Sequence, residues 1–272
     1  MVDEISVKPL TEKQLLDYEK LKLKPNLTIK QEGKFLFYNK KEDSEKLRDT
    51  ILGRGAKSML NEVYIREKYN KQTIFFSKDY NIGALNGTLS EYRSLELVAN
   101  FTGERFKVNK DLISNQHIKG KIDAYTGKSI KNATKVVEIK TASSMSTLIS
   151  LINQEELKTK YYWQLMGYLL LTKAEIAEIY HVLVTYDSNI INESVNRYLS
   201  KVRGMGLPKQ DIDKEIENIR FNLTFDEIPV TQRIVKFSVT RNEADINRIK
   251  TKVLSARKYL VEFDKAYTSM NT

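Results

Sequence analysis

The chain has 272 residues, and its 45 Lys and Arg residues against 35 Asp and Glu residues give a formal net charge of +10. This length allows one large domain or two modest ones. The basic excess favours a polyanionic partner, nucleic acid first and an acidic membrane surface second, with a merely soluble basic protein as the alternative. Cysteine is absent, which excludes disulfides, Cys-zinc sites, iron–sulfur clusters and cysteine nucleophiles. Histidine occurs only twice, which excludes multi-histidine metal sites. Any metal would therefore be bound mainly by oxygen, as Mg²⁺ or Mn²⁺ is.

Helices dominate the predicted elements of the first hundred residues. The patterns predict a helix over 11–22, a short strand over 34–38 and a helix over 43–51. Gly53 and Gly55 interrupt this last helix, and Ala56, Met59 and Val63 then recur at helical spacing, which predicts a helix over 56–69. A further helix is expected over 89–98.

The pattern then changes to strands, followed by a mixture of helices and strands. The expected elements are strands over 104–108, 116–125 and 134–141, helices over 146–157 and 161–173, a strand over 179–186, a charged helical hairpin over 192–222, a strand over 233–239 and a long amphipathic helix over 241–266 capped by Asn242. This order predicts an α/β fold with a mixed central β-sheet flanked by helices. Because no Gly/Ser linker or repeat occurs, we expect one domain over 1–272 with a helical insertion at about 191–222.

Two neighbouring segments carry the most informative residues. Asp123 ends one apolar-edged segment, and Glu138 and Lys140 lie two residues apart in a β-branched run. Side chains alternate across a strand, so Glu138 and Lys140 share one face while Val137 and Ile139 point into the core. Two further Glu-x-Lys triplets occur in the chain, but neither lies in a β-branched strand that follows an aspartate-bearing segment.

These residue types suit metal-dependent hydrolysis of a phosphodiester. Asp123 and Glu138 offer anionic oxygens to Mg²⁺, for which Mn²⁺ is expected to substitute, and the main-chain carbonyl of Ile139 is a candidate third ligand. Such a metal lowers the pKa of a bound water and draws charge off the scissile phosphate, while Lys140 positions that water and stabilises the developing charge. The alternative is a surface salt bridge between Glu138 and Lys140.

The arrangement resembles the PD-(D/E)xK nuclease superfamily, whose signature is Asp followed by Glu-x-Lys across two strands. Here Lys121-Ile122-Asp123 replaces the Pro-Asp of that signature. Gln164 and Tyr168 lie four residues apart, on one helical face, and resemble the Gln-xxx-Tyr motif of the RecB-like and lambda-exonuclease-like branch. In that branch the glutamine supports the metal site and the nearby phosphate; the alternative is an aromatic-rich core helix. The resemblance implies a restriction-endonuclease-like core over about 51–187 and 233–267.

The same branch places an acidic residue on an upstream helix, after a glycine. Glu62, which follows Gly55, is the best match, with Glu67 as its competitor and an ordinary surface glutamate as the alternative. The resemblance therefore implies Glu62 as a further catalytic residue and metal ligand.

Four cations flank the acidic motifs and are candidates for contact with a phosphate backbone. They are Arg54, Lys57, Lys158 and Lys160. Contacts of this kind would make binding salt-dependent.

The resemblance is closest to phage recombination exonucleases, and it implies a Mg²⁺-dependent deoxyribonuclease that resects duplex DNA for recombination or repair. DNA is then the main partner, with a single-strand annealing protein and further copies of the chain as additional partners. Three alternatives stay open: a structure- or sequence-specific endonuclease, a catalytically silent DNA-binding protein, and a basic scaffold protein without metal.

The apolar segments of the sequence indicate the cellular location that we expect for the protein. Met1 to Ile5 lack the basic-then-apolar pattern of a signal peptide, and the longest apolar run, around 165–171, is too short to span a bilayer. We therefore expect a cytoplasmic protein with no membrane partner, located in the host cytoplasm if a phage encodes it.

Overall fold

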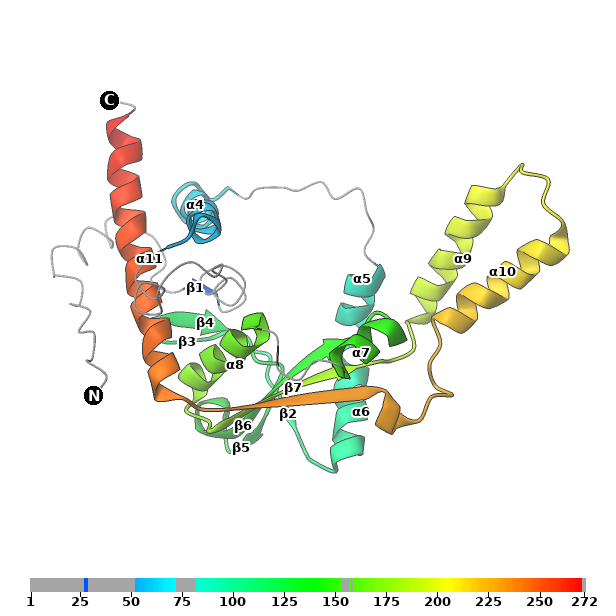
Figure 1. Cartoon of the computed structure of the whole chain (residues 1–272), viewed down its shortest axis with the longest axis horizontal. Coiled ribbons are helices and arrows are strands. Elements are labelled where there is room, and N and C mark those ends of the chain that lie inside the picture. The colour runs from blue at the N-terminus through cyan, green and yellow to red at the C-terminus, as the bar shows by residue number, and fades with distance from the viewer. Residues whose placement is uncertain (1–26, 29–51, 72–81, 153–156, 158, 271–272) are drawn as a thin grey trace.

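A computed structural model describes residues 27–28, 52–71, 82–152, 157 and 159–270 of the chain (Figure 1). The elements predicted over 11–22, 34–38 and 43–51 lie outside these residues. The strands are β1 (Leu27–Thr28), β2 (Lys107–Val108), β3 (Ile113–Ser114), β4 (Ile118–Gly120), β5 (Ala124–Gly127), β6 (Ala133–Thr141), β7 (Ile176–Val182) and β8 (Ile234–Thr240). The α-helices are α4 (Arg54–Tyr69), α5 (Ile82–Leu89), α6 (Glu91–Thr102), α7 (Met145–Ile152), α8 (Thr159–Thr172), α9 (Ser188–Val202), α10 (Lys209–Asn222) and α11 (Glu243–Ser269), with short 3₁₀ turns at Ile130–Asn132 and Val230–Gln232.

The centre of the fold is a five-stranded sheet in the order β2-β5-β6-β7-β8. β6 and β7 run parallel, whereas the other neighbouring strands run antiparallel. The predicted α/β class with a mixed central sheet is thus confirmed. A smaller sheet has the order β1-β4-β3.

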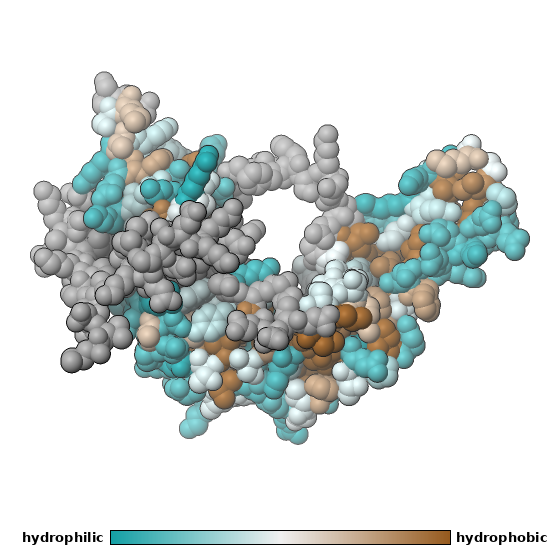
Figure 2. Space-filling view, in the orientation of Figure 1, coloured by the Kyte–Doolittle hydropathy of each residue, from teal (hydrophilic) through white to brown (hydrophobic). Residues whose placement is uncertain are grey.

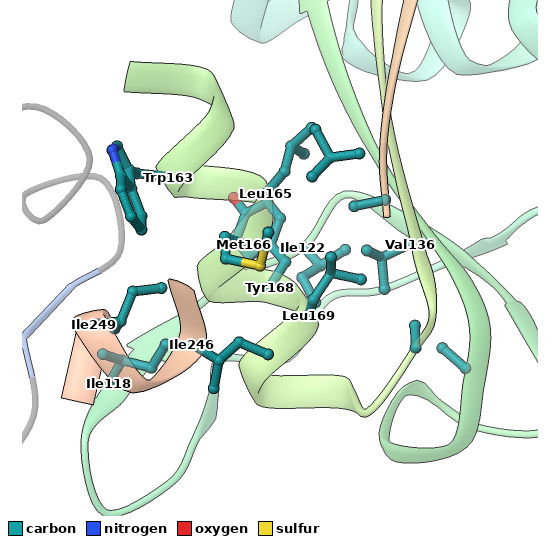
Figure 3. Packing of buried hydrophobic residues seen from close by; sticks show 14 of the residues in the cluster. Ile118, Ile122, Val136, Trp163, Leu165, Met166, Tyr168, Leu169, Ile246 and Ile249 are labelled. Carbon is teal, nitrogen blue, oxygen red and sulfur yellow. The ribbon is translucent and has the colours of Figure 1, made fainter. Parts of the chain in front are cut away.

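Both faces of β6 are covered, which explains its nearly continuous apolar run. Val137 and Ile139 pack with Leu95 and Val98 of α6. Val136 lies on the opposite side, in the cluster formed by α8 and the first turns of α11 (Figure 3). The strand is therefore held between two helices, and its polar residues are positioned by the packing of both.

The predicted strand over 116–125 is instead two strands in different sheets, with a break at Lys121–Asp123. Asn109 fixes this break: its side-chain amide donates to the carbonyl of Ile122 at 3.0 Å, and its backbone N–H donates to that of Asp123 at 3.0 Å. β7 also begins earlier than predicted, because Ile176 already pairs with Lys135 of β6.

Two helical units flank the sheet. α4 packs against α11, whose N-cap is Asn242 as predicted, since its side-chain oxygen accepts from the N–H groups of Ala244 and Asp245. α9 and α10 form the predicted helical hairpin, which extends away from the sheet (Figure 1). Apolar residues interrupt its hydrophilic surface (Figure 2); the exposed ones are Leu199, Met205, Leu207 and Phe221. Among the described helices, none combines the length and apolar character needed to cross a membrane.

Candidate active site

Asp123 lies between the two sheets, immediately before β5. Ala124 pairs with Val137 of β6, so the break in the chain brings the Asp123 carboxylate to the following residues of β6. Its Oδ2 accepts a hydrogen bond from the backbone N–H of Ile139 at 2.8 Å. This contact fixes the carboxylate beside the Glu-x-Lys segment.

Glu138 is buried, with only 1% of its surface exposed, and its carboxylate accepts three hydrogen bonds. Oε1 accepts from Lys140 Nζ and, at 2.7 Å, from Gln164 Nε2, while Oε2 accepts from the hydroxyl of Tyr168 at 3.0 Å. A buried carboxylate needs such partners, because an unpaired charge in the interior costs several kcal/mol or more. The pair of Glu138 and Lys140 is therefore part of an internal network rather than a surface salt bridge.

Two of the three partners of Glu138 come from one face of α8. Gln164 and Tyr168 are 7% and 1% exposed, and Gln164 Nε2 also donates to the hydroxyl of Tyr168 at 2.8 Å. The structure thus brings Asp123, Glu138 and Lys140 together with both residues of the Gln-xxx-Tyr pattern. Their catalytic roles stay predictions.

The charges at this site perturb one another. Burial raises the pKa of Asp123 to about 7, and repulsion from the carboxylates of Glu138 and Glu91 adds to this, while the N–H of Ile139 and the charge of Lys140 oppose it. Burial alone would lower the pKa of Lys140, but attraction to Glu138 and Asp123 outweighs it and the pKa is raised. At neutral pH, Lys140 is consequently a cation.

Tyr168 is the neutral member of the network. Burial, followed by the nearby charges of Glu138 and Asp123, raises the pKa of its hydroxyl well above the ordinary value. The hydroxyl therefore keeps its proton at neutral pH and acts as a donor to Glu138.

Asp123 also lines a cavity of about 220 Å³ with α6, which we call the Asp123 cavity. Its wall includes Ile139 and Glu91, the first residue of α6. Glu91 was not among the residues predicted from sequence. The signal that suggested Glu62, an acidic residue on a helix after a glycine, is met equally by Glu91, which follows Gly87.

The structure does not bring Glu62 to this site. Glu62 is exposed on α4, and α4 packs against α11 rather than against the central sheet. The helix that brings a carboxylate, Glu91, to the Asp123 cavity is instead α6, because α6 is the helix that packs on β6. The catalytic role of Glu62 stays a prediction that its position on α4 does not support, whereas Glu91 lines the cavity with Asp123.

Among the comparisons with known proteins, solved structures of exonucleases align with most of this chain. No family model and no curated protein match this sequence. A solved phage-related exonuclease from Haemophilus somnus 129PT aligns over 91% of this chain and 99% of its own, with a TM-score of 0.65 and 19% identity. An alkaline exonuclease from Laribacter hongkongensis aligns over 94% and 100%, with a TM-score of 0.57 and 15% identity, and the same enzyme in complex with dAMP gives 0.56, 15% identity and coverages of 95% and 100%.

The chain has the fold of these exonucleases. This agrees with the resemblance to the PD-(D/E)xK superfamily that the sequence motifs indicate. Because identity is below 20%, the likeness concerns the fold alone.

A site for a hard divalent cation near Asp123 stays a prediction. Glu91, Asp123 and Ile139 line one cavity, and a cation bound there would offset the burial of Asp123 and its repulsion from Glu138 and Glu91, which together raise the pKa of Asp123. In the described part of the chain, no group of three or more His, Asp and Glu side chains is arranged closely enough to hold a metal. Both oxygens of Glu138 accept hydrogen bonds, from the side chains of Lys140, Gln164 and Tyr168.

Three of the four basic candidates lie on two helices, α4 and α8. Arg54 and Lys57 are exposed at the start of α4. Lys160 is exposed on α8, one turn before Gln164, with its Nζ 4.5 Å from the centre of the Tyr161 ring. Lys158 lies outside the described residues. Lys160 is thus the candidate nearest to the Glu138 network along the helix.

Proposed function

We propose that this protein is a metal-dependent deoxyribonuclease that hydrolyses DNA phosphodiester bonds, acting as an exonuclease. The observation that carries the proposal is the network that joins Glu138 to Lys140, Gln164 and Tyr168, with Asp123 held beside this strand by the N–H of Ile139. The fold supports the same conclusion, because solved exonucleases share it over nearly their whole length. DNA as substrate is supported by the neighbour that was solved with dAMP.

Asp123, Glu91 and the carbonyl of Ile139 are the groups that would hold Mg²⁺ or Mn²⁺, with Glu138 beside them. Such an ion supplies Lewis-acid stabilisation of the phosphate and a bound water of lowered pKa. Lys140 contributes a fixed positive charge, because its pKa is raised, and this charge stabilises the oxygens of the phosphate as they become more negative.

Gln164 and Tyr168 act as positioning residues in this proposal. Their donors hold the two oxygens of Glu138, so the strand and its lysine keep one arrangement before substrate arrives. The hydroxyl of Tyr168 keeps its proton and takes no part in proton transfer, because its pKa is raised well above the ordinary value.

The test uses end-labelled linear duplex DNA with Mg²⁺, with Mn²⁺, or with a chelator, and the products are sized over time. We expect nucleotide release only with metal, and loss of that release in Asp123→Ala, Glu138→Ala and Lys140→Ala while DNA binding persists. Gln164→Ala should be impaired but active, and Asp213→Ala, which removes an exposed carboxylate on α10, is the matched control. Normal cleavage by any of the first three variants would remove that residue from the mechanism.

Closed circular duplex distinguishes the two kinds of nuclease. An exonuclease leaves it intact, whereas cutting at a rate similar to that of linear ends would establish an endonuclease. DNA binding without any metal-dependent release of nucleotides would establish a catalytically silent binding protein.

A role in recombination or repair is the finer part of the proposal. It is supported by the description of one structural neighbour as a phage-related exonuclease. An enzyme in this role converts blunt duplex into molecules with long single-stranded ends, which strand-specific labels detect. A single-strand annealing protein and further copies of the chain stay predicted partners, and co-elution with such a protein and light scattering of the protein alone test them.

A further inference from the structure

A second, larger groove adjoins the Asp123 cavity. It has a volume of about 630 Å³, and we call it the α6 groove. The two spaces share Tyr92, Leu95 and Val108 in their walls, so they adjoin at these residues. A ligand that reaches Asp123 with one part can therefore extend into the α6 groove with another.

The walls of the α6 groove are built by a helix and the segment that follows it. Tyr92, Glu96 and Asn100 recur every four residues and line one face of α6. At its end Gly103 adopts a left-handed φ of +70°, and Glu104, Arg105, Phe106 and Val108 form the rest of the wall. Phe106 in that wall packs against the apolar cluster of α6 and β6, so the groove is anchored to the core and pre-formed.

Tyr92 stands where the two spaces meet, and its surface is 69% exposed. Leu89 and Val108, which line the Asp123 cavity with it, are 50% and 48% exposed. Clustered exposed apolar side chains mark a binding surface more often than isolated ones do. A flat exposed ring beside a catalytic cavity offers a stacking surface for an aromatic ligand.

The groove contains two carboxylates, Glu96 and Glu104, of which Glu104 is paired with Lys135, and two polar residues that suit a nucleotide. Asn100 offers both a donor and an acceptor, as the edge of a nucleobase requires, and Arg105 offers a guanidinium that suits a phosphate. The volume is within the range of about 300–1,000 Å³ that is usual for small-ligand sites.

We propose that the α6 groove binds the nucleotide adjoining the scissile phosphate, with its base stacked on Tyr92. This inference rests on the proposed nuclease function of the Asp123 cavity. Stacking tolerates any base, whereas the amide of Asn100 discriminates among base edges, so the groove would give the enzyme a modest preference for the terminal nucleotide.

The experiment measures binding of dAMP and of deoxyribose 5-phosphate by titration calorimetry with Mg²⁺ present. We expect dAMP to bind the unaltered protein about tenfold more tightly than the sugar phosphate, which corresponds to one base–aromatic stack. Tyr92→Ala should abolish this difference and Tyr92→Phe should keep it. Phe221→Ala is the matched control, because Phe221 is also 69% exposed but lies on α10.

The same variants are then assayed on duplex ends that carry either a normal or an abasic terminal nucleotide. Equal rates on both ends in Tyr92→Ala, with a base-dependent rate in the unaltered protein, support the groove. Absent hydrolysis together with Tyr92-dependent binding of dAMP refutes the nuclease function alone. Two results overturn the nucleotide-binding proposal alone, provided that hydrolysis is intact. Either dAMP binds no more tightly than the sugar phosphate, or Tyr92→Ala leaves dAMP binding unchanged. The exposed apolar residues beside the groove would then be a site for a peptide ligand.

Discussion

The hydrogen bond from Tyr168 to Glu138 allows a quantitative test of the network that does not depend on activity. Tyr168→Phe keeps the aromatic ring in the core but removes the hydroxyl that lies 3.0 Å from Glu138 Oε2. The carboxylate then loses one of its three donors at a position where only 1% of Glu138 is exposed. Water cannot readily replace that donor.

The cost follows from the charge of the acceptor. A hydrogen bond to a charged group contributes about 1.5–3 kcal/mol to stability, so we expect a loss of about 2 kcal/mol in the free energy of unfolding. An unfolding entropy of about 2.1 cal/mol/K for each residue converts that loss into a decrease in Tm of about 4 °C for a chain of 272 residues.

A double-mutant cycle with Glu138→Gln isolates the contact between the two side chains. Urea denaturation is measured for the unaltered protein, both single variants and the double variant. Glu138→Gln removes the charge, so Tyr168→Phe should cost only about 1 kcal/mol in that background and the coupling should be about 1 kcal/mol. Tyr198→Phe, on α9, controls for loss of a hydroxyl outside the network.

Two results would refute this reasoning. The first is a Tyr168→Phe variant as stable as the unaltered protein. The second is a pair of costs that add within about 0.5 kcal/mol, because additivity is what independent sites show.

Three further predictions concern other parts of the molecule. Glu91→Gln should lower metal-dependent hydrolysis about 100-fold in steady-state assays, because it removes a charged candidate ligand, whereas Glu62→Gln should leave the rate unchanged. Asp123 has a pKa of about 7 in the folded protein against an ordinary value of 3.8, so the folded state binds more protons than the unfolded state between these pH values. The free energy of unfolding of the metal-free protein should therefore fall by about 4 kcal/mol as the pH rises from about 4 to 7. Urea denaturation of Asp123→Asn should not show this decrease. Gly127→Ala should cost at least about 2 kcal/mol in the same assay, because φ is +113° and a Cβ would meet main-chain atoms at 2.8 and 2.9 Å, while Gly87→Ala meets nothing within 4 Å and serves as its control.

Each of these predictions has a contradictory outcome. Equal activity of the Glu91 and Glu62 variants would contradict the assignment of the helical metal ligand to α6 rather than to α4. Parallel pH profiles for the unaltered protein and the Asp123 variant would mean that burial does not perturb this carboxyl. A stable Gly127→Ala variant would show that the turn after β5 relaxes without loss.

The sequence predicted those features that depend on nearby residues. The Glu-x-Lys strand, the Gln-xxx-Tyr helix and the Asn242 cap each arise from residues within one element, and the structure contains all three elements. The division of the strand over 116–125 was missed because it depends on Asn109, which bonds across a distance in sequence that no local pattern reveals.

Glu91 was missed for a related reason. Two helices in the first hundred residues carry a glutamate after a glycine, and their sequences alone do not say which one packs on β6. Buried contacts of Leu95 and Val98 with Val137 decide in favour of α6, and such tertiary contacts are not encoded in either helix by itself.

The hairpin of α9 and α10 leaves and rejoins the body of the protein at a single point. The N–H of Tyr186 donates to the carbonyl of Leu223 at 2.9 Å, and that of Phe225 donates to the Thr185 hydroxyl at 2.9 Å. Because these hydrogen bonds join the two ends of the hairpin, a short turn could replace the outer part of α9 and α10 without disrupting the sheet. The hairpin is consequently a suitable insertion site for a fluorescent reporter or an affinity tag, away from the candidate active site.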